Sequence, residues 1–333
     1  MSNLRLHFIV RLICLAVLLA ATAGCRPADE PMSMGETMPT LTPVALSADE
    51  RLNVVATTSI VGDVVRAVGG DRVALTVLLP PGSDPHAYEP TPQDAAAVAD
   101  ADVVFINGAG LELFLERLLR SAGSQTPVVP LSYGIPLRQV AEEEGHEHEE
   151  HEGEHEHGEY DPHTWFDPNN VIVWTENVES ALSALDPAGA DLYAANGAAY
   201  RARLQELDAW IRNQVAQVPP EQRLLVTDHA MFGYFADRYG FEQVGAVLPG
   251  FSTLAQPSAQ ELAALEESIR ALGVRAVFVG TGVNPNLAER VAEDTGTQLV
   301  VLYTHSLSEP GGPADSYLAL MRTDVTAIVE ALR

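Results

Sequence analysis

The stretch LNVVATTSIVGDVVRAVGGDRVALTVLLPPG, residues 52–82, decides the fold class of this chain. It opens with an apolar run rich in β-branched residues, 52–58, that predicts a strand. Apolar side chains at helical spacing follow over 60–68 and end at a Gly-Gly-Asp turn. A second run, 73–79, predicts another strand that ends at two prolines. Strand, helix and strand at this spacing favour a parallel sheet covered by helices.

The alternation continues on both sides of a long helical segment. Residues 187–218 carry apolar side chains at spacings of three, four or seven, which predicts one helix of about 45 Å. Other strands are expected at 102–106, 128–129, 223–227, 245–248, 276–279 and 299–302, and other helices from Thr91, at 111–119, 169–185, 231–239, 258–272, 286–294 and 314–332. The pattern predicts an N-terminal α/β lobe over 51–186, a linking helix over 187–218 and a C-terminal α/β lobe over 219–333. The lobes show no simple sequence repeat.

Residues 1–24 predict an export signal, because an apolar run too short for a membrane span ends in small residues. The run closes on LAATAGC, residues 19–25, which predicts lipidation of Cys25. Ordinary signal cleavage, with Cys25 incidental, is the alternative. Residues 25–50 are then expected to be a lipid anchor and a disordered tether, since they are rich in Pro, Met, Thr and Glu without periodicity.

Composition excludes one broad class of function. The 333 residues carry a formal net charge of −27, and no basic patch is available to neutralise phosphates, so nucleic-acid binding is not expected. A tract over 142–159 supplies ten of the negative charges and also holds five histidines. A solvated charge run is the plain interpretation of this tract, but solubility does not require imidazoles. We therefore favour weak accessory zinc capture by His146, His148, His151, His155 and His157.

Four histidines lie outside the signal and the tract: His86, His163, His229 and His305. Each follows a predicted strand, and ligand sites in open parallel sheets lie outside the carboxyl ends of strands. Two come from each lobe, so the four are expected to meet in an interlobe cleft. For a single histidine a surface or core role is the more common one. The joint pattern favours a metal site.

Three of these histidines have an aspartate beside them. Asp84 and Asp161 stand two residues before His86 and His163 in Asp-Pro-His triplets, and Asp228 directly precedes His229. A ligating imidazole needs its second ring nitrogen fixed, commonly by a carboxylate. We therefore expect the three aspartates to orient the imidazoles.

Four neutral imidazoles favour Zn²⁺, whereas Mn²⁺ or Fe²⁺ is better served by carboxylates. Because imidazole must be neutral to bind, metal affinity is expected to fall below pH ~6.5. A closed set of four histidines leaves no position for a catalytic water, and no hydrolase or nucleotide-binding motif is present, so no enzyme activity is expected. A three-histidine zinc hydrolase with Glu89 as general base is the enzymatic alternative.

Five segments resemble one known family, the solute-binding lipoproteins of metal-uptake ABC transporters that handle zinc and manganese (cluster A-I, or cluster 9). They are GSDPHAYEPTP (82–92), NGAGLE (107–112), DPHTW (161–165), DHAMFGYF (228–235) and RYG (238–240). The resemblance implies two Rossmann-like α/β lobes joined by one long rigid helix, with metal held in the interlobe cleft. It also implies only slight closure of the lobes.

The resemblance places His86, His163 and His229 on three family ligand positions. A histidine at the third position and an acidic, His-rich loop are typical of zinc members. The fourth position departs from the family pattern, because many members have Asp where His305 stands. The fourth ligand is then either His305 or a water.

The expected function is capture of Zn²⁺ outside the cytoplasm and its delivery to an ABC-type membrane permease. The protein is expected to be monomeric, and either lipid-anchored to the cell membrane or periplasmic. The alternatives are a manganese or iron(II) binder of the same family, and a surface adhesin or zinc-buffering lipoprotein.

Overall fold

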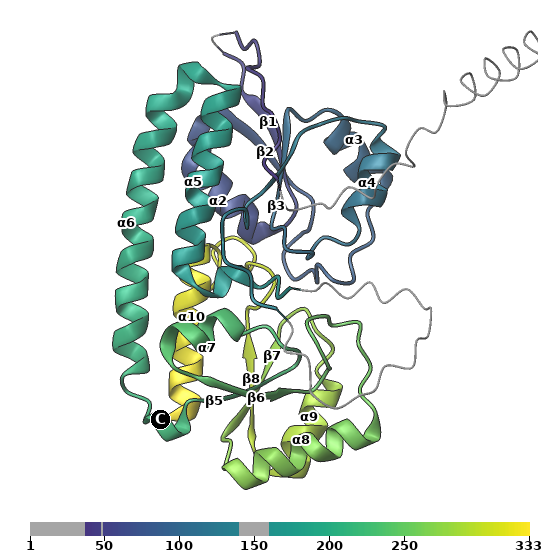
Figure 1. Ribbon diagram of the computed structural model, residues 1–333, viewed down its shortest axis with the longest axis vertical. Coiled ribbons are helices and arrows are strands. Elements are labelled where there is room, and N and C mark those ends of the chain that lie inside the picture. Colours follow the sequence, from purple (N-terminus) through teal and green to yellow (C-terminus); the bar gives the residue numbers. More distant parts are fainter. Residues whose placement is uncertain (1–36, 48, 140–159) are drawn as a thin grey trace, which may run out of the picture. The chain divides into compact units, whose positions relative to one another are not determined.

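Two parallel four-stranded sheets organise the computed structural model, which describes residues 37–47, 49–139 and 160–333. The strand order is β2-β1-β3-β4 in the N-terminal lobe and β6-β5-β7-β8 in the C-terminal lobe (Figure 1). Both lobes therefore have the same topology, although their sequences show no simple repeat. In each order the first strand of the lobe lies inside the sheet, so the chain crosses over there and creates a switch point at the carboxyl ends.

The N-terminal lobe matches the strands expected from its apolar runs. Its strands are β1 (Leu52–Ala56), β2 (Val73–Val77), β3 (Val103–Ile106) and β4 (Val128–Pro130), and its helices are α2 (Ser59–Gly69), α3 (Pro92–Ala99), α4 (Leu115–Ala122) and α5 (Pro168–Leu185). The helix predicted over 111–119 begins later than expected. Positive φ angles at Gly108, Ala109 and Gly110 keep that stretch in a turn.

The C-terminal lobe contains β5 (Leu224–Thr227), β6 (Glu242–Ala246), β7 (Ala276–Gly280), β8 (Gln298–Leu302), α7 (Gly233–Tyr239), α8 (Ala259–Leu272), α9 (Asn286–Thr295) and α10 (Tyr317–Leu332). The strand predicted at 245–248 lies a few residues earlier, as β6. This edge strand begins with Glu242 and Gln243 and is at most half-buried, so its apolar signal is weak.

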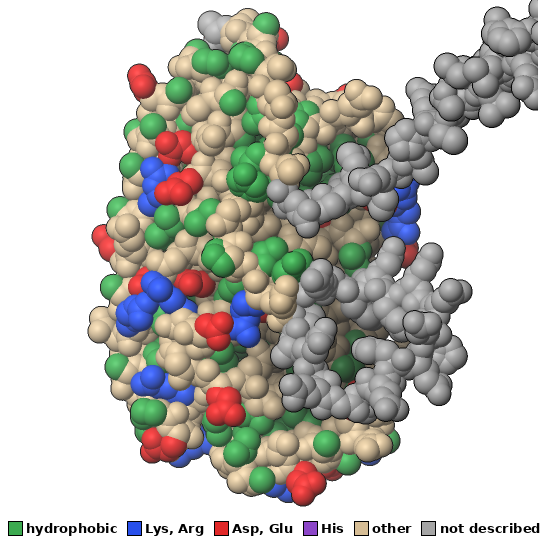
Figure 2. Space-filling view, viewed as in Figure 1, with side chains coloured by type: hydrophobic (Ala, Val, Ile, Leu, Met, Phe, Trp, Pro, Cys, Tyr) green, Lys and Arg blue, Asp and Glu red, His purple; other side chains and the backbone are tan. Residues whose placement is uncertain are grey.

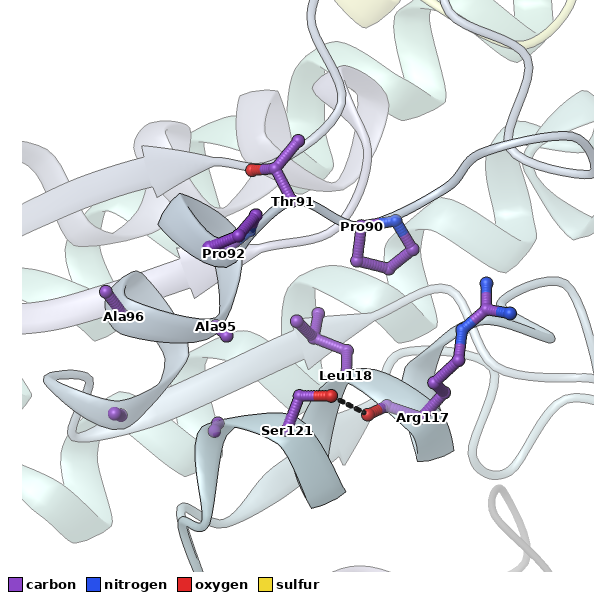
Figure 3. Close-up of a pocket in the computed structure, with 10 residues that line it drawn as sticks. Pro90, Thr91, Pro92, Ala95, Ala96, Arg117, Leu118 and Ser121 are labelled. Carbon is purple, nitrogen blue, oxygen red and sulfur yellow. Dashed lines mark hydrogen bonds between the residues drawn. The ribbon is translucent and has the colours of Figure 1, made fainter.

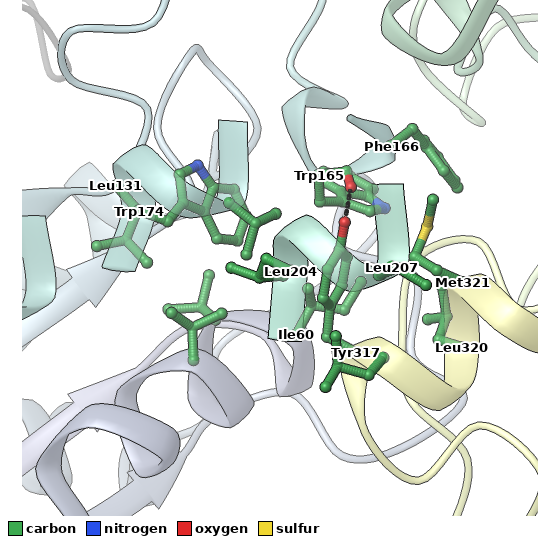
Figure 4. Close-up of a cluster of buried hydrophobic side chains, with 14 of the residues drawn as sticks. Ile60, Leu131, Trp165, Phe166, Trp174, Leu204, Leu207, Tyr317, Leu320 and Met321 are labelled. Atoms are coloured by element: carbon green, nitrogen blue, oxygen red, sulfur yellow. Dashed lines mark hydrogen bonds between the residues drawn. The ribbon is translucent and has the colours of Figure 1, made fainter. Parts of the chain in front are cut away.

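One long helix, α6 (Ala190–Val215), runs along both lobes (Figure 1). A short 3-10 turn, Pro187–Gly189, precedes it, so the α-helix is shorter at both ends than the predicted 187–218. One continuous hydrophobic cluster contains side chains of α2, α5, α6 and α10 together with strand residues of both sheets. Figure 4 shows Ile60 of α2, Leu204 of α6 and Leu320 of α10 in this cluster. The lobes therefore share a core, which restricts large hinge motions.

The expectation of a disordered tether over 25–50 is wrong in its C-terminal part. Met38, Leu41, Val44 and Leu46 pack against the shared core, and the Val44 N–H donates to the carbonyl of Leu185 over 2.8 Å. The apolar residues of this Pro- and Thr-rich segment thus lie on the core, and Val44 contacts the last residue of α5. Such packing has no regular period, which is why the sequence pattern does not reveal it.

Within the described residues, no helix is both long and apolar enough to cross a membrane. Figure 2 shows acidic and basic side chains interspersed over the viewed face, with scattered apolar ones between them.

Candidate metal centre

The four predicted histidines lie together, and each follows a strand. His86 lies in the loop after β2, His163 after β4, His229 after β5 and His305 after β8. One ring nitrogen from each lies within 4.8 Å of those of the other three. The Nε2 atom of His163 is 3.3 Å from that of His86 and 3.2 Å from that of His229. The shared topology thus brings two imidazoles from each lobe to one point.

Two of the imidazoles have a carboxylate beside the ring. The Nδ1 atom of His163 lies 2.8 Å from Oδ1 of Asp161, and that of His229 lies 2.5 Å from Oδ1 of Asp228. Each carboxylate also accepts the backbone N–H of its histidine. The second oxygen of Asp228 accepts the N–H of Gly280 over 2.6 Å, which ties the pair to β7.

Asp84 differs from this expectation. Its Oδ1 accepts the backbone N–H of His86 over 2.9 Å, and its Oδ2 accepts the hydroxyl of Thr253 from the other lobe. Asp84 therefore fixes the backbone that carries His86 rather than the ring. The proline between them restricts the backbone at this bend.

His305 has a neutral neighbour in place of an acid. Its Nδ1 lies 2.9 Å from the hydroxyl oxygen of Thr304, and its ring stacks on His229 at 4.9 Å between centroids. Its Nε2 is buried without a hydrogen-bond partner among the described residues. The acid suggested by sequence proximity, Glu309, is exposed. An unpartnered buried nitrogen beside three other imidazoles is a donor available to a cation.

The site is buried, and burial governs its protonation. Burial, aided by the nearby charge of His229, lowers the pKa of His86 to about 3. Burial also holds the pKa values of His163 and His305 well below their ordinary value. Burial raises the pKa of Asp161 to about 7, against the opposing effects of the His163 N–H and Arg138. These three imidazoles are therefore neutral at neutral pH, while Asp161 is near its midpoint.

Two supporting residues lie in a segment that the sequence singled out only as a motif. The side-chain amide of Asn107 donates to the carbonyl of Pro162 over 2.9 Å. Glu112 is buried and accepts from the hydroxyl of Thr57 and from the backbone N–H groups of Asn107 and Gly108. This NGAGLE turn thus holds the loop that carries His163.

Arg138 was not expected from the sequence. Its Nε lies 3.8 Å from Oδ2 of Asp161, and its Nη1 donates to the carbonyl of Gly233 over 2.6 Å and to Asp237. It therefore connects the N-terminal lobe with α7 of the other lobe and places a positive charge beside the carboxylate behind His163. No sequence signal marks Arg138, because it stands 23 positions before Asp161 in the chain, by the residue numbers of the two.

Some predicted residues lie outside the described part of the chain, namely Cys25 and the tract histidines 146, 148, 151, 155 and 157. Gln139 and Tyr160, which are described, form an isolated antiparallel bridge. A separate groove of about 490 Å³ lies between α3 and α4. Figure 3 shows Pro90, Ala95, Arg117 and Leu118 around it, and none of the four histidines lines it.

Comparisons with known proteins agree with this architecture. The family described as zinc-uptake complex component A, periplasmic, matches residues 54–331. The manganese-binding lipoprotein MntA of Halalkalibacterium halodurans is 35% identical over 85% of this chain and 89% of its own. The iron ABC transporter substrate-binding lipoprotein MtsA of Streptococcus pyogenes is 31% identical over 85% of this chain and 89% of its own.

Solved structures show the same fold. The periplasmic zinc-binding protein TroA of Treponema pallidum superposes with a TM-score of 0.75 at 27% identity, covering 85% of this chain and 99% of that one. A manganese-bound periplasmic metal-binding protein of Candidatus Liberibacter asiaticus gives 0.73 at 28% identity, covering 85% and 100%. The expected two-lobed fold is confirmed. The chain therefore belongs to the zinc-uptake family of extracytoplasmic solute-binding proteins, which bind metal for an ABC-type permease and its ATPase and are not enzymes.

Proposed function

We propose that this protein captures Zn²⁺ through His86, His163, His229 and His305 and delivers it to its permease. The observation that carries the proposal is the donor set: four imidazoles meet, and no carboxylate or thiolate belongs to this group of described residues. Imidazole nitrogen suits Zn²⁺, whereas Mn²⁺ is better served by oxygen ligands.

The tautomers of two histidines support a cation between them. When Asp161 and Asp228 are ionised they can only accept hydrogen bonds through Oδ1, so the Nδ1 atoms of His163 and His229 then carry the hydrogen. Their Nε2 atoms then face each other as bare lone pairs at 3.2 Å. Two lone pairs at this distance repel unless a positive charge lies between them.

The spacing also suits tetrahedral zinc. A Zn–N distance of about 2.0–2.1 Å places the nitrogens of a tetrahedral site about 3.3–3.4 Å apart. The two Nε2–Nε2 separations, 3.3 Å from His163 to His86 and 3.2 Å from His163 to His229, are close to that edge length. Little movement of the imidazoles is then needed when the metal enters.

A second candidate function differs from the first in the metal that is bound. One relative is named for manganese and another for iron, so manganese or iron(II) uptake is the alternative. Competition calorimetry with Zn²⁺ against Mn²⁺ on the purified protein decides between them. We expect Zn²⁺ to displace Mn²⁺ completely at equal concentrations, and a preference for Mn²⁺ would overturn the zinc assignment.

Other parts of the chain support zinc capture and delivery. Cys25 is the lipid anchor, the protein acts as a monomer, and the tract over 142–159 supplies weak additional zinc sites. Deletion of the tract is expected to leave one tight site per molecule and to remove only weak binding. Equilibrium dialysis at graded zinc concentrations measures both classes of site.

A further inference from the structure

One segment of the N-terminal lobe, Gly82–Asp84, is held by three separate loops of the C-terminal lobe. The N–H of Gly82 donates to the hydroxyl oxygen of Ser306 over 2.6 Å. The hydroxyl of Thr253 donates to Oδ2 of Asp84. The third contact, with Gly282, is made by backbone alone. We call the segment and its three partners the clasp.

The backbone contact is close enough that any side chain at Gly282 would force the facing backbone to shift. A Cβ added at Gly282 would lie 3.0 Å from the carbonyl oxygen of Gly82 and 3.7 Å from the carbonyl carbon of Ser83. The φ angle of Gly282 is not among the positive ones, so the backbone conformation itself does not require glycine there. The close approach of the two lobes is what crowds a larger residue at this position.

The clasp is connected to the imidazole of His86 through Asp84. Asp84 receives Thr253 on one oxygen and the backbone N–H of His86 on the other. His86 is also the most exposed of the four histidines, at 8% against 0% for His163 and His229 and 4% for His305. A metal leaving the site by way of His86 therefore crosses the least covering protein.

We propose that the clasp positions His86 and sets the rate of metal release, with Gly282 and Thr253 as positioning residues. This inference rests on the proposed function, since it takes His86 as a ligand. While the clasp is closed, His86 is held against the other three imidazoles. When the lobes separate at Gly282, Asp84 loses its hydrogen bond from Thr253, and His86 is the first imidazole to leave the metal. His163 and His229 stay in place, because each keeps the hydrogen bond to its own carboxylate.

The test is stopped-flow dissociation of Zn²⁺ into a chromophoric chelator, with association followed separately. Thr253→Val removes the hydroxyl at constant size, and Thr253→Ser keeps it. Loss of a hydrogen bond to a charged group predicts about tenfold faster dissociation for the valine variant and little change for serine. Gly282→Ala and Gly282→Val form a graded wedge, with Thr281→Ala as an exposed control in the same loop.

Dissociation should speed up from Gly282 to alanine to valine, with association changed by less than about twofold. Cobalt(II) substitution checks the ligands, because the intense tetrahedral absorption should be retained in every variant. If the rate of Zn²⁺ dissociation is unchanged in both Thr253→Val and Gly282→Val, and both variants unfold at the normal temperature, the proposed role of the clasp is wrong. The four-histidine zinc site is not affected by that result. Failure of the unaltered protein to bind zinc tightly would instead overturn the proposed function, and the clasp as a zinc gate with it.

Discussion

The ring of His163 and the carboxylate of Asp161 form a fully buried pair joined over 2.8 Å, and the free oxygen of that carboxylate faces Arg138 at 3.8 Å. The pKa of Asp161 is raised to about 7 by burial, while that of His86 is lowered to about 3. The proton that competes with metal near neutral pH is therefore held by the carboxylate, not by these imidazoles.

This relationship changes the expected pH dependence of metal binding. Below pH 7 metal-free Asp161 is protonated, and metal binding through His163 requires it ionised, so one proton must leave. Apparent zinc affinity should fall about tenfold per pH unit between pH 7 and 5. Asp161→Asn should bind about 10–100-fold more weakly at pH 8 and lose this slope. Chelator competition at several pH values measures both, and a slope that survives in Asp161→Asn would assign the proton to an imidazole instead.

Arg138 and Asp237 should move this midpoint in opposite directions. The positive charge of Arg138 lowers the pKa of Asp161, whereas the negative charge of Asp237 raises that pKa. Arg138→Gln should therefore move the pH midpoint of zinc affinity above 7 and weaken binding at pH 7 about tenfold, with recovery at pH 9. Asp237→Asn, at an exposed position, should move the midpoint down and by less. Shifts of the same sign in both variants would contradict an electrostatic origin.

His305 should govern the choice of metal. His305→Asp replaces a nitrogen donor with oxygen and retains an ionisable side chain at a nearly buried position. We expect zinc affinity to fall and the ratio of manganese to zinc affinity to rise at least about tenfold. His305→Asn, a neutral replacement, is the control. Calorimetry with each metal gives the ratio, and an unchanged ratio in the aspartate variant would remove His305 from the ligand set.

His86 should destabilise the metal-free protein in acid. Its pKa is about 3 in the folded chain against an ordinary value of 6.5, so between these values only the unfolded chain binds the proton. The free energy of unfolding then falls as the pH falls from 6.5 towards 3.

Between pH 6.5 and 5 this amounts to about 2 kcal/mol for His86. Asp161 acts in the opposite sense, because its folded pKa is raised, but it does so in both the unaltered protein and His86→Gln. Urea unfolding of both proteins with chelator present, at pH 7 and pH 5, isolates the His86 contribution. Equal losses of stability in the two proteins would count against it.

Much of the fold followed from the apolar runs, because buried parallel strands are continuous apolar segments. β6 was misplaced because an edge strand carries polar residues such as Glu242. The positions of the four histidines followed from their places after strands. The contacts of Asp84 with Thr253 and of Asp161 with Arg138 did not, since both join residues far apart in sequence through loops without a period.

The shared core also fixes the order in which this chain can fold. α10, the last 16-residue helix, supplies Tyr317, Met321 and Val325 to the cluster that holds α2 and α6. Neither lobe can complete its interior before these residues have been synthesised, although the first strand begins at Leu52. A chain cut before Tyr317 should therefore be insoluble as a whole rather than leave a folded N-terminal lobe, and the intact protein should melt in a single calorimetric transition.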